Sequence, residues 1–174
     1  RDVRHRISEF NTKLKKLDGI SKLPNDVSIS EKKELQSAET ELEVPSNETS
    51  VFDSAILSFN ANDFEVALTR FNLFKDLYPQ SMNLAEAYYW LGKTNTELMN
   101  YKDSASAFLE SFSLAPNGDF AWKSLLSLAI ALGDLGQLEQ GCLTLGELKS
   151  RFPGSVLQNQ DQVLSAEEHL KCSP

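Results

Sequence analysis

Proline recurs every 37 residues in this 174-residue chain, at Pro79, Pro116 and Pro153. Residues of matched size recur at the same interval. Two repeat positions hold small residues, namely Ala55, Gly92 and Ala129 at the first and Ala67, Ser104 and Gly141 at the second. Two others hold large residues, namely Phe64, Tyr101 and Leu138 at the first and Phe71, Phe108 and Leu145 at the second. Matched chemistry at five positions in three copies defines an internal repeat, and the fold must therefore be an array of similar units.

Each copy has the apolar spacing of two helices, and its proline ends the second helix because proline lacks an N–H. Small residues in both helices allow close packing, at the lower end of the usual separation of roughly 8 to 10 Å. We expect helices over about 51–60, 63–77, 83–98, 101–114, 119–134, 138–150 and 156–171, with Asn62, Asn100 and Ser155 as N-caps of three of them. The sequence therefore predicts an all-α domain over 50–174, with three helix-turn-helix repeats and a capping helix.

Residues 1–18 carry a different pattern, an apolar seam with alternating spacings of four and three residues. Its members are Val3, Ile7, Phe10, Leu14 and Leu17. This spacing is typical of the a and d positions of a coiled coil, so we expect the end of a longer oligomerising coiled coil. The alternative is an amphipathic helix that docks on the chain's own domain.

Residues 19–49 are expected to form a flexible acidic linker. They contain Pro24 and Pro45, many polar residues and a net charge of −4. Such a segment buries too little apolar surface to offset the entropy lost on ordering. Asn47-Glu48-Thr49 also matches the glycosylation acceptor pattern, which is a weak signal in a linker.

The composition excludes several classes of function. A net charge of −8 and a pI near 4.8 disfavour nucleic acid as a partner, which would require a basic surface. The sequence has no apolar run of about 18 residues, so we expect no membrane span. The chain begins at Arg1 without an apolar leader, and we expect a soluble fragment or a processed mature chain.

No reactive constellation is recognisable in the sequence. The two histidines, His5 and His169, lie near opposite ends of the chain, and we expect both on the solvated surface. Phosphate-binding loops, zinc-protease motifs and nucleophile elbows do not occur. We therefore predict a protein that is not an enzyme and that needs no cofactor or metal.

The repeat resembles the tetratricopeptide repeat, whose unit places small, aromatic and proline residues in this order. The period of 37 is three residues longer than the general repeat. More narrowly, the chain resembles the periplasmic Tol-Pal-associated tetratricopeptide proteins, the cell division coordinator family. The segments that carry this likeness are Tyr89-Trp90-Leu91-Gly92, Tyr101 to Phe108, Phe71 to Ser81, Gly136 to Leu145 and Arg151-Phe152-Pro153-Gly154-Ser155. Ser104 and Gly141 depart from the family, which usually has Ala there.

The resemblance implies a short trimeric coiled coil and a polar linker before the repeats, in a periplasmic protein. It implies two partners, the inner-membrane Tol-Pal energiser protein and a peptidoglycan synthase. The expected role is a non-enzymatic adaptor that coordinates cell-wall synthesis with outer-membrane constriction during division. The alternatives are a structural oligomerisation module and an outer-membrane assembly factor built from similar repeats.

The first helices of repeats of this kind form a concave groove, which is their usual binding face. The groove positions of the general repeat fall here on Phe52, Ile56, Phe59, Tyr89, Lys93, Leu126 and Ile130. An apolar strip rimmed by charges suits an amphipathic helix or an extended peptide. Alternatively, the linker or another protomer covers part of the strip. We expect Tyr89 to contact a partner, and Trp90 and Trp122 to pack between helices.

The two cysteines, Cys142 and Cys172, leave a question open. If their helices fold back antiparallel about Pro153, the two cysteines lie at levels that differ by about six residues, or roughly 9 Å along the helix axis. That exceeds the usual Cα separation in a disulfide, about 6.8 Å at most. A longer turn or a kink would close the gap, and an oxidising periplasm would favour the bond. The sequence therefore allows both a disulfide and two free thiols.

Overall fold

The computed structural model describes residues 47–172, so the predicted coiled coil (1–18) and most of the predicted linker (19–46) lie outside the described residues. Within residues 47–172 the chain forms eight α-helices and no strand. The helices are α2 (Glu48–Asn60), α3 (Phe64–Leu77), α4 (Leu84–Glu97), α5 (Tyr101–Leu114), α6 (Ala121–Asp134), α7 (Leu138–Arg151), α8 (Pro153–Gln158) and α9 (Gln160–Leu170). The prediction of an all-α repeat fold is confirmed.

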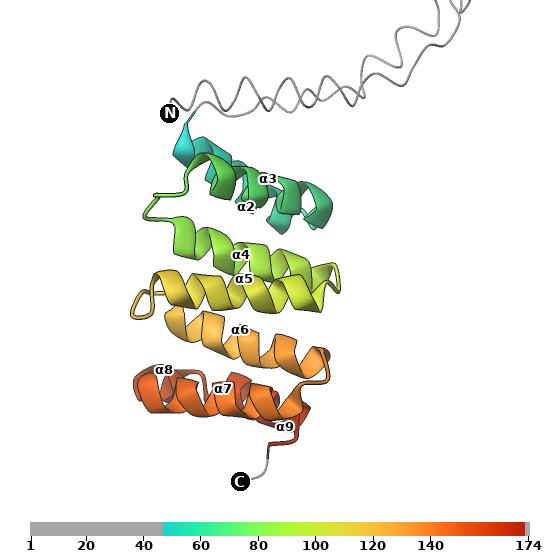
Figure 1. Cartoon of the computed structure of the whole chain (residues 1–174), viewed down its shortest axis with the longest axis vertical. Coiled ribbons are helices and arrows are strands. Elements are labelled where there is room, and N and C mark those ends of the chain that lie inside the picture. The colour runs from blue at the N-terminus through green and yellow to red at the C-terminus, as the bar shows by residue number, and fades with distance from the viewer. Residues whose placement is uncertain (1–46, 173–174) are drawn as a thin grey trace, which may run out of the picture. The chain divides into compact units, whose positions relative to one another are not determined.

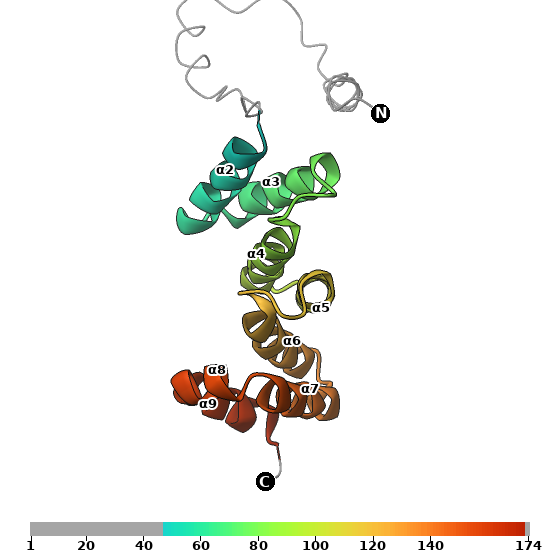
Figure 2. The ribbon, with the colours of Figure 1, turned by 90° about the vertical axis from the view of Figure 1, so that its left-hand side faces the viewer.

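The three repeats are the helix pairs α2/α3, α4/α5 and α6/α7. Each helix packs on the helices before and after it in the chain, and α9 returns to contact both α6 and α7. Figure 1 shows the helices stacked in chain order, and Figure 2 shows that their axes rotate along the stack. The stack thus grows mainly by contacts between consecutive helices, as expected of repeat proteins.

The small residues of the repeat lie where helices meet. Ala55, Ala129, Ala67 and Ser104 are all 0% exposed. Gly92 lies against the ring of Phe108 so closely that an added Cβ would come within 2.6 Å of it. Because a larger side chain at these positions would push the helices apart, the repeat retains small ones.

The turn inside each repeat has a recurring backbone conformation that the sequence pattern did not predict. Asn62, Met99 and Gly136 are 37 residues apart, and all have positive φ, at 60°, 58° and 78°. Helix α3 therefore begins one residue later than the prediction of Asn62 as its N-cap implies. Asp63 is the N-cap of α3, and its carboxylate accepts a hydrogen bond from the Val66 N–H. Asn100 is the N-cap of α5 as predicted, although its side chain makes no capping hydrogen bond.

Helix α2 begins two residues before the predicted domain start at residue 50. Asn47 is its N-cap, and the Asn47 side chain accepts a hydrogen bond of 2.8 Å from the Ser50 N–H. Glu48 also accepts a hydrogen bond, from the Ser81 hydroxyl at the start of the next repeat. The last residues assigned to the linker therefore belong to the first helix.

The predicted single helix over 156–171 is wrong, because the structure has two helices there. Helix α8 begins at Pro153, where the fixed φ of proline suits a first helical position. Ser155 therefore lies inside α8 and is not its cap. The chain leaves helical geometry at Asn159, with φ −124° and ψ 36°, and α9 then runs along α6 and α7.

Two buried hydroxyls join three helices. Ser111 of α5 donates a 2.7 Å hydrogen bond to the Ala85 carbonyl of α4, and its oxygen lies 2.8 Å from the Ser124 hydroxyl of α6. Ser111 is 1% exposed and Ser124 is 0% exposed. Because the Ser111 proton is used by Ala85, Ser124 is the donor within the pair.

Replacing Ser111 by Ala should lower the free energy of unfolding by about 1 to 3 kcal/mol, because it leaves the buried Ser124 hydroxyl without a partner. Chemical denaturation of the purified chain measures this. Ser113→Ala is the matched control, since its exposed hydroxyl bonds only to Leu109 within α5. The double variant Ser111→Ala/Ser124→Ala should recover part of the loss. Equal effects of Ser111→Ala and Ser113→Ala would contradict this view.

Candidate partner-binding groove

A cavity of about 630 Å³ opens between α4, α6 and α9. Its lining comes from two repeats and from the last helix. The residues are Tyr89, Lys93, Leu126, Ser127 and Ile130 on α4 and α6, and Asp161, Gln162, Ser165, Ala166 and His169 on α9. We call this cavity the α9 groove. One side of it is apolar, and its rim carries both positive and negative groups.

Four of the seven predicted groove residues line this cavity: Tyr89, Lys93, Leu126 and Ile130. The other three do not. Phe52, Ile56 and Phe59 belong to α2, and they pack in a hydrophobic cluster at the opposite end of the stack. The predicted continuous strip over three repeats is therefore restricted to the second and third repeats.

The position predicted for Phe52 needs correction. Phe52 is only 9% exposed, and its ring packs on Phe71 and Phe74 of α3, with ring centroids 6.1 and 5.2 Å away. It is a core residue because α3 provides two aromatic rings on that side of α2. Phe59 is half-buried, with its ring 5.2 Å from that of Trp90 in the next repeat.

The seven residues fall largely into two rows with the 37-residue period. Phe52, Tyr89 and Leu126 form the first row, and two of its members are at most 9% exposed. Ile56, Lys93 and Ile130 form the second row, one helical turn further on, and all three are half-buried. The second row is therefore more accessible than the first.

Tyr89 connects the groove to the core. Its ring centroid lies 5.1 Å from that of Phe120, 5.6 Å from that of Trp90 and 5.8 Å from that of Phe108. Burial raises the pKa of the Tyr89 phenol above its ordinary value of 10.0, and a hydrogen bond with Ser127 acts in the opposite direction. Tyr89 is thus a fixed, neutral wall of the groove. Its contact with a partner stays a prediction.

The two tryptophans lie between helices, as expected. Trp90 packs between Phe59 and Tyr89, and its indole N–H donates a 3.1 Å hydrogen bond to Glu86. Trp122 is half-buried against the C-terminal cluster. The Lys123 ammonium lies 4.8 Å from the centre of the Phe120 ring, near the start of α6.

Helix α9 forms the wall that sequence reasoning missed. Its buried face consists of Val163, Ala166 and Leu170. The His169 Nε2 atom lies 3.0 Å from the Asp134 carboxylate of α6, and Glu167 pairs with Lys149 of α7. The apolar stripe of this helix indicated a cap on the stack. No signal in the sequence indicated that the polar side of the cap would face the concave groove.

The structure also settles the geometry of the cysteines. Cys142 and Cys172 form a disulfide, with their Cα atoms 5.5 Å apart. The mismatch of about six residues disappears because the helix breaks at Asn159 and α9 begins a new path. The disulfide fixes the end of α9 to α7, and α9 is the third wall of the groove.

Two further findings concern residues 47–172 only. None of their helices is both long and apolar enough to cross a bilayer. Their His, Cys, Asp and Glu side chains also form no group of three or more that could hold a metal ion.

Comparisons with known proteins agree with the repeat fold. A tetratricopeptide repeat family model matches residues 123–155. Among solved structures, the chain is similar to a MamA RS-1 ArsTM double mutant, with a TM-score of 0.54, 21% identity and 72% of each chain covered. It is also similar to a Podosopora anserina protein described as a kinesin light chain with nearly identical TPR-like repeats. That match has a TM-score of 0.59 and 12% identity, and it covers 79% of this chain and 69% of the other.

A comparison with curated protein sequences gave no significant match. The repeat match and the two structural matches support a tetratricopeptide-repeat protein. At these identities the solved structures establish the fold alone. Repeats of this class typically act as scaffolds that bind other proteins.

Proposed function

We propose that this protein is a non-enzymatic adaptor that captures a segment of another envelope protein in the α9 groove. The observation that carries the proposal is that residues from two repeats and from the last helix line one cavity of about 630 Å³. Such a volume lies within the range of ligand pockets, roughly 300 to 1,000 Å³, and accepts a few side chains rather than a whole domain.

The lining indicates the chemistry of the captured segment. Leu126, Ile130 and Tyr89 offer apolar contacts, while Lys93 and Asp161 offer one charge of each sign. An amphipathic helix would place its apolar face against the first set and its charged residues against the second. We therefore propose an amphipathic helical segment as the bound element.

The proposed setting is the periplasm, with the Tol-Pal system as the context. The resemblance in the repeats supports this role, and so does the Cys142–Cys172 disulfide, because disulfides persist in oxidising compartments. The proposed partners are the inner-membrane Tol-Pal energiser protein and a peptidoglycan synthase. The adaptor would then coordinate cell-wall synthesis with outer-membrane constriction during division. Trimerisation through residues 1–18 is part of the same proposal.

Replacing Ile130 by Asp should weaken binding of the energiser protein's periplasmic region at least tenfold, because a buried carboxylate would face the apolar side of the segment. Isothermal titration calorimetry with the full chain measures the change. Ile56→Asp is the matched control, because Ile56 occupies the same repeat position but lies outside the cavity. It should change binding less than twofold. Equal loss in both variants, or in neither, would refute the assignment of the groove.

A further inference from the structure

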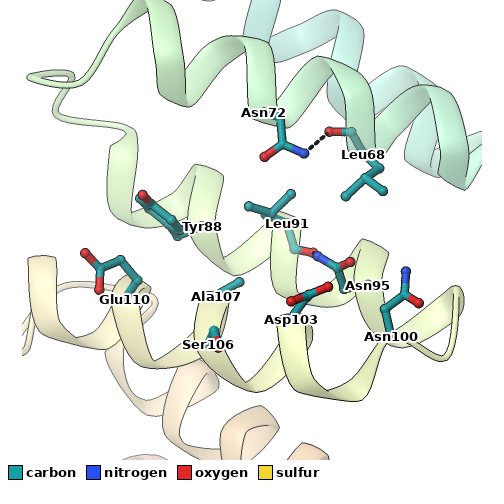
Figure 3. A pocket seen from close by; sticks show the side chains of 10 residues that line it. All are labelled: Leu68, Asn72, Tyr88, Leu91, Asn95, Asn100, Asp103, Ser106, Ala107 and Glu110. Carbon is teal, nitrogen blue, oxygen red and sulfur yellow. Dashed lines mark hydrogen bonds between the residues drawn. The ribbon is translucent and has the colours of Figure 1, made fainter.

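A second cavity, of about 470 Å³, lies between α3, α4 and α5 (Figure 3). Its polar lining includes Asn72, Asn95, Asp103 and Glu110, together with Tyr88. We call it the acceptor pocket. Its α4 residues, Tyr88 and Asn95, lie on a different face of the helix from Tyr89 and Lys93 of the α9 groove, because successive residues are about 100° apart. The two cavities are therefore separate sites.

Three amide side chains line this pocket, and two of them, Asn72 and Asn95, each donate one N–H within their own helix. Asn72 Nδ2 donates to the Leu68 carbonyl at 3.0 Å, and Asn95 Nδ2 donates to the Leu91 carbonyl at 2.9 Å. Each of these amides keeps a second N–H and its oxygen, which can only accept. Asn95 is 4% exposed, and within residues 47–172 no group donates to its Oδ1 atom. Figure 3 shows this amide in the pocket beside Asp103.

The repeat fold does not require most of this polar lining, although Glu147 is the counterpart of Glu110. In the next repeat, 37 residues further on, the positions of Asn72, Tyr88 and Asn95 are occupied by leucines, and that of Asp103 by a glutamine. These counterparts are Leu109, Leu125, Leu132 and Gln140. Burying a leucine side chain is more favourable in free energy than burying an amide, because the polar groups of the amide must be paired. The next repeat therefore keeps the same fold without an amide at the position of Asn95, which points to a role in binding.

The charge of the pocket determines the kind of ligand it can accept. Asp103 and Glu110 line it, and no Lys or Arg does. The pKa of the Tyr88 phenol is raised, first by burial and then by the negative charges of Glu110 and Asp76. A ligand must therefore bring hydrogen-bond donors and positive charge. A guanidinium group meets both needs, because it carries five N–H donors and a permanent charge.

We propose that the acceptor pocket binds a basic segment of a partner protein, with one arginine side chain beside Asn95 and Asp103 and a second beside Tyr88 and Glu110. Asp103 and Glu110 are two helical turns apart on α5, roughly 10 Å along its axis. In a peptide with polyproline II geometry, side chains three residues apart lie on the same face, about 9 Å from each other. The segment therefore carries two arginines at positions i and i+3. This site does not depend on the function proposed for the α9 groove.

The test uses the ¹⁵N-labelled full chain and the peptide acetyl-Arg-Gly-Gly-Arg-amide, followed by NMR. The expected result is saturable shifts of the Asn95 side-chain amide and of backbone amides around Asp103 and Glu110. The same peptide with citrulline in place of both arginines keeps the shape and loses the charge, and it should bind at least tenfold more weakly. Equal shifts with the two peptides, or no shifts in this region at millimolar peptide, would overturn the proposal.

Variants that copy residues of the next repeat distinguish a specific binding site from non-specific attraction of the basic peptide to an acidic domain. Asn95→Leu and Asp103→Gln reproduce Leu132 and Gln140, and each should weaken peptide binding at least tenfold. Asp53→Asn removes the same charge as Asp103→Gln, at an exposed position on α2, and should change binding less than twofold. Because Asp103 is exposed, its variant should fold even if Asn95→Leu does not. Equal effects of Asp103→Gln and Asp53→Asn would refute the site.

Discussion

Reduction of the Cys142–Cys172 disulfide should lower the free energy of unfolding of the C-terminal part of the stack by roughly 3 to 4 kcal/mol. The bond closes a loop with a sequence separation of 30, and chain-entropy estimates give about this value for a loop of that length. Without the bond, α9 is held by Val163, Ala166 and Leu170, by the His169–Asp134 contact and by the Glu167–Lys149 pair. Because repeats contact only their neighbours, the loss should be local.

Hydrogen exchange with and without reductant measures this effect. Amides of α9 and of α7 should exchange faster after reduction, whereas those of α2 and α3 should not change. A variant with both cysteines replaced by Ala should behave like the reduced chain and show no response to reductant. Uniform acceleration across all helices, or no acceleration in α9, would contradict the local role. Because α9 is a wall of the α9 groove, reduction should also weaken partner binding.

Replacing Gly141 by Ala should lower the free energy of unfolding by about 1 to 3 kcal/mol, the usual cost of overpacking a core. A Cβ at this position would lie 2.5 Å from Leu170 Cδ2 and 2.9 Å from the Ala129 carbonyl oxygen. The Ala129 oxygen belongs to the backbone of α6 and cannot rotate away. The helices would therefore have to separate, although alanine by itself favours a helix over glycine.

Gly146 is the matched control for Gly141, because it lies on the same helix with nothing within 4 Å of an added Cβ. Gly146→Ala should raise the free energy of unfolding by about 0.8 to 1 kcal/mol, through helix propensity alone. Urea denaturation of the two variants gives both values. If Gly141→Ala is as stable as the unsubstituted chain, the packing of α9 on α7 is looser than the structure indicates.

The neighbours of Gly141 and Ser104 explain two departures of this chain from the family it resembles. The family usually has Ala at both positions. At Gly141 the extra space is filled by Leu170 of α9, which comes closer than a methyl group would allow. At Ser104 the hydroxyl lies 2.7 Å from the Thr96 hydroxyl, so the polar side chain is paired inside the repeat. Each of the two residues is therefore matched to a specific neighbouring side chain.

The 37-residue period predicted most of the fold, because it reports which residues must be small or apolar at each helix contact. It placed Ala55, Ala67 and Ala129 in the interior, where they are 0% exposed. It could not place the break at Asn159, which lies outside the three copies and depends on how α9 packs against α6. Nor could it predict the positive φ of Met99, since methionine has no preference for that conformation.

The groove was predicted in part, since repeat positions give the face of a helix but not what covers that face. Lys93 and Ile130 line the cavity, and their contact with a partner stays a prediction. Phe52 lies outside the cavity, because its ring is buried against Phe71 and Phe74 of the neighbouring helix. The acceptor pocket was missed entirely. Its signal is the amide of Asn95 at a position where the next repeat has Leu132, and this becomes visible only when the repeats are compared position by position.

Site-specific photo-crosslinking tests the partner role of the α9 groove most directly. p-Benzoylphenylalanine would replace Ile130 in one variant of the full chain and Leu109, an exposed residue of α5 outside the groove, in another. Each variant would be irradiated with the periplasmic region of the Tol-Pal energiser protein. We predict a crosslink from position 130 and none from position 109. A crosslink from position 109 alone would show that the partner binds elsewhere and would contradict the proposed function.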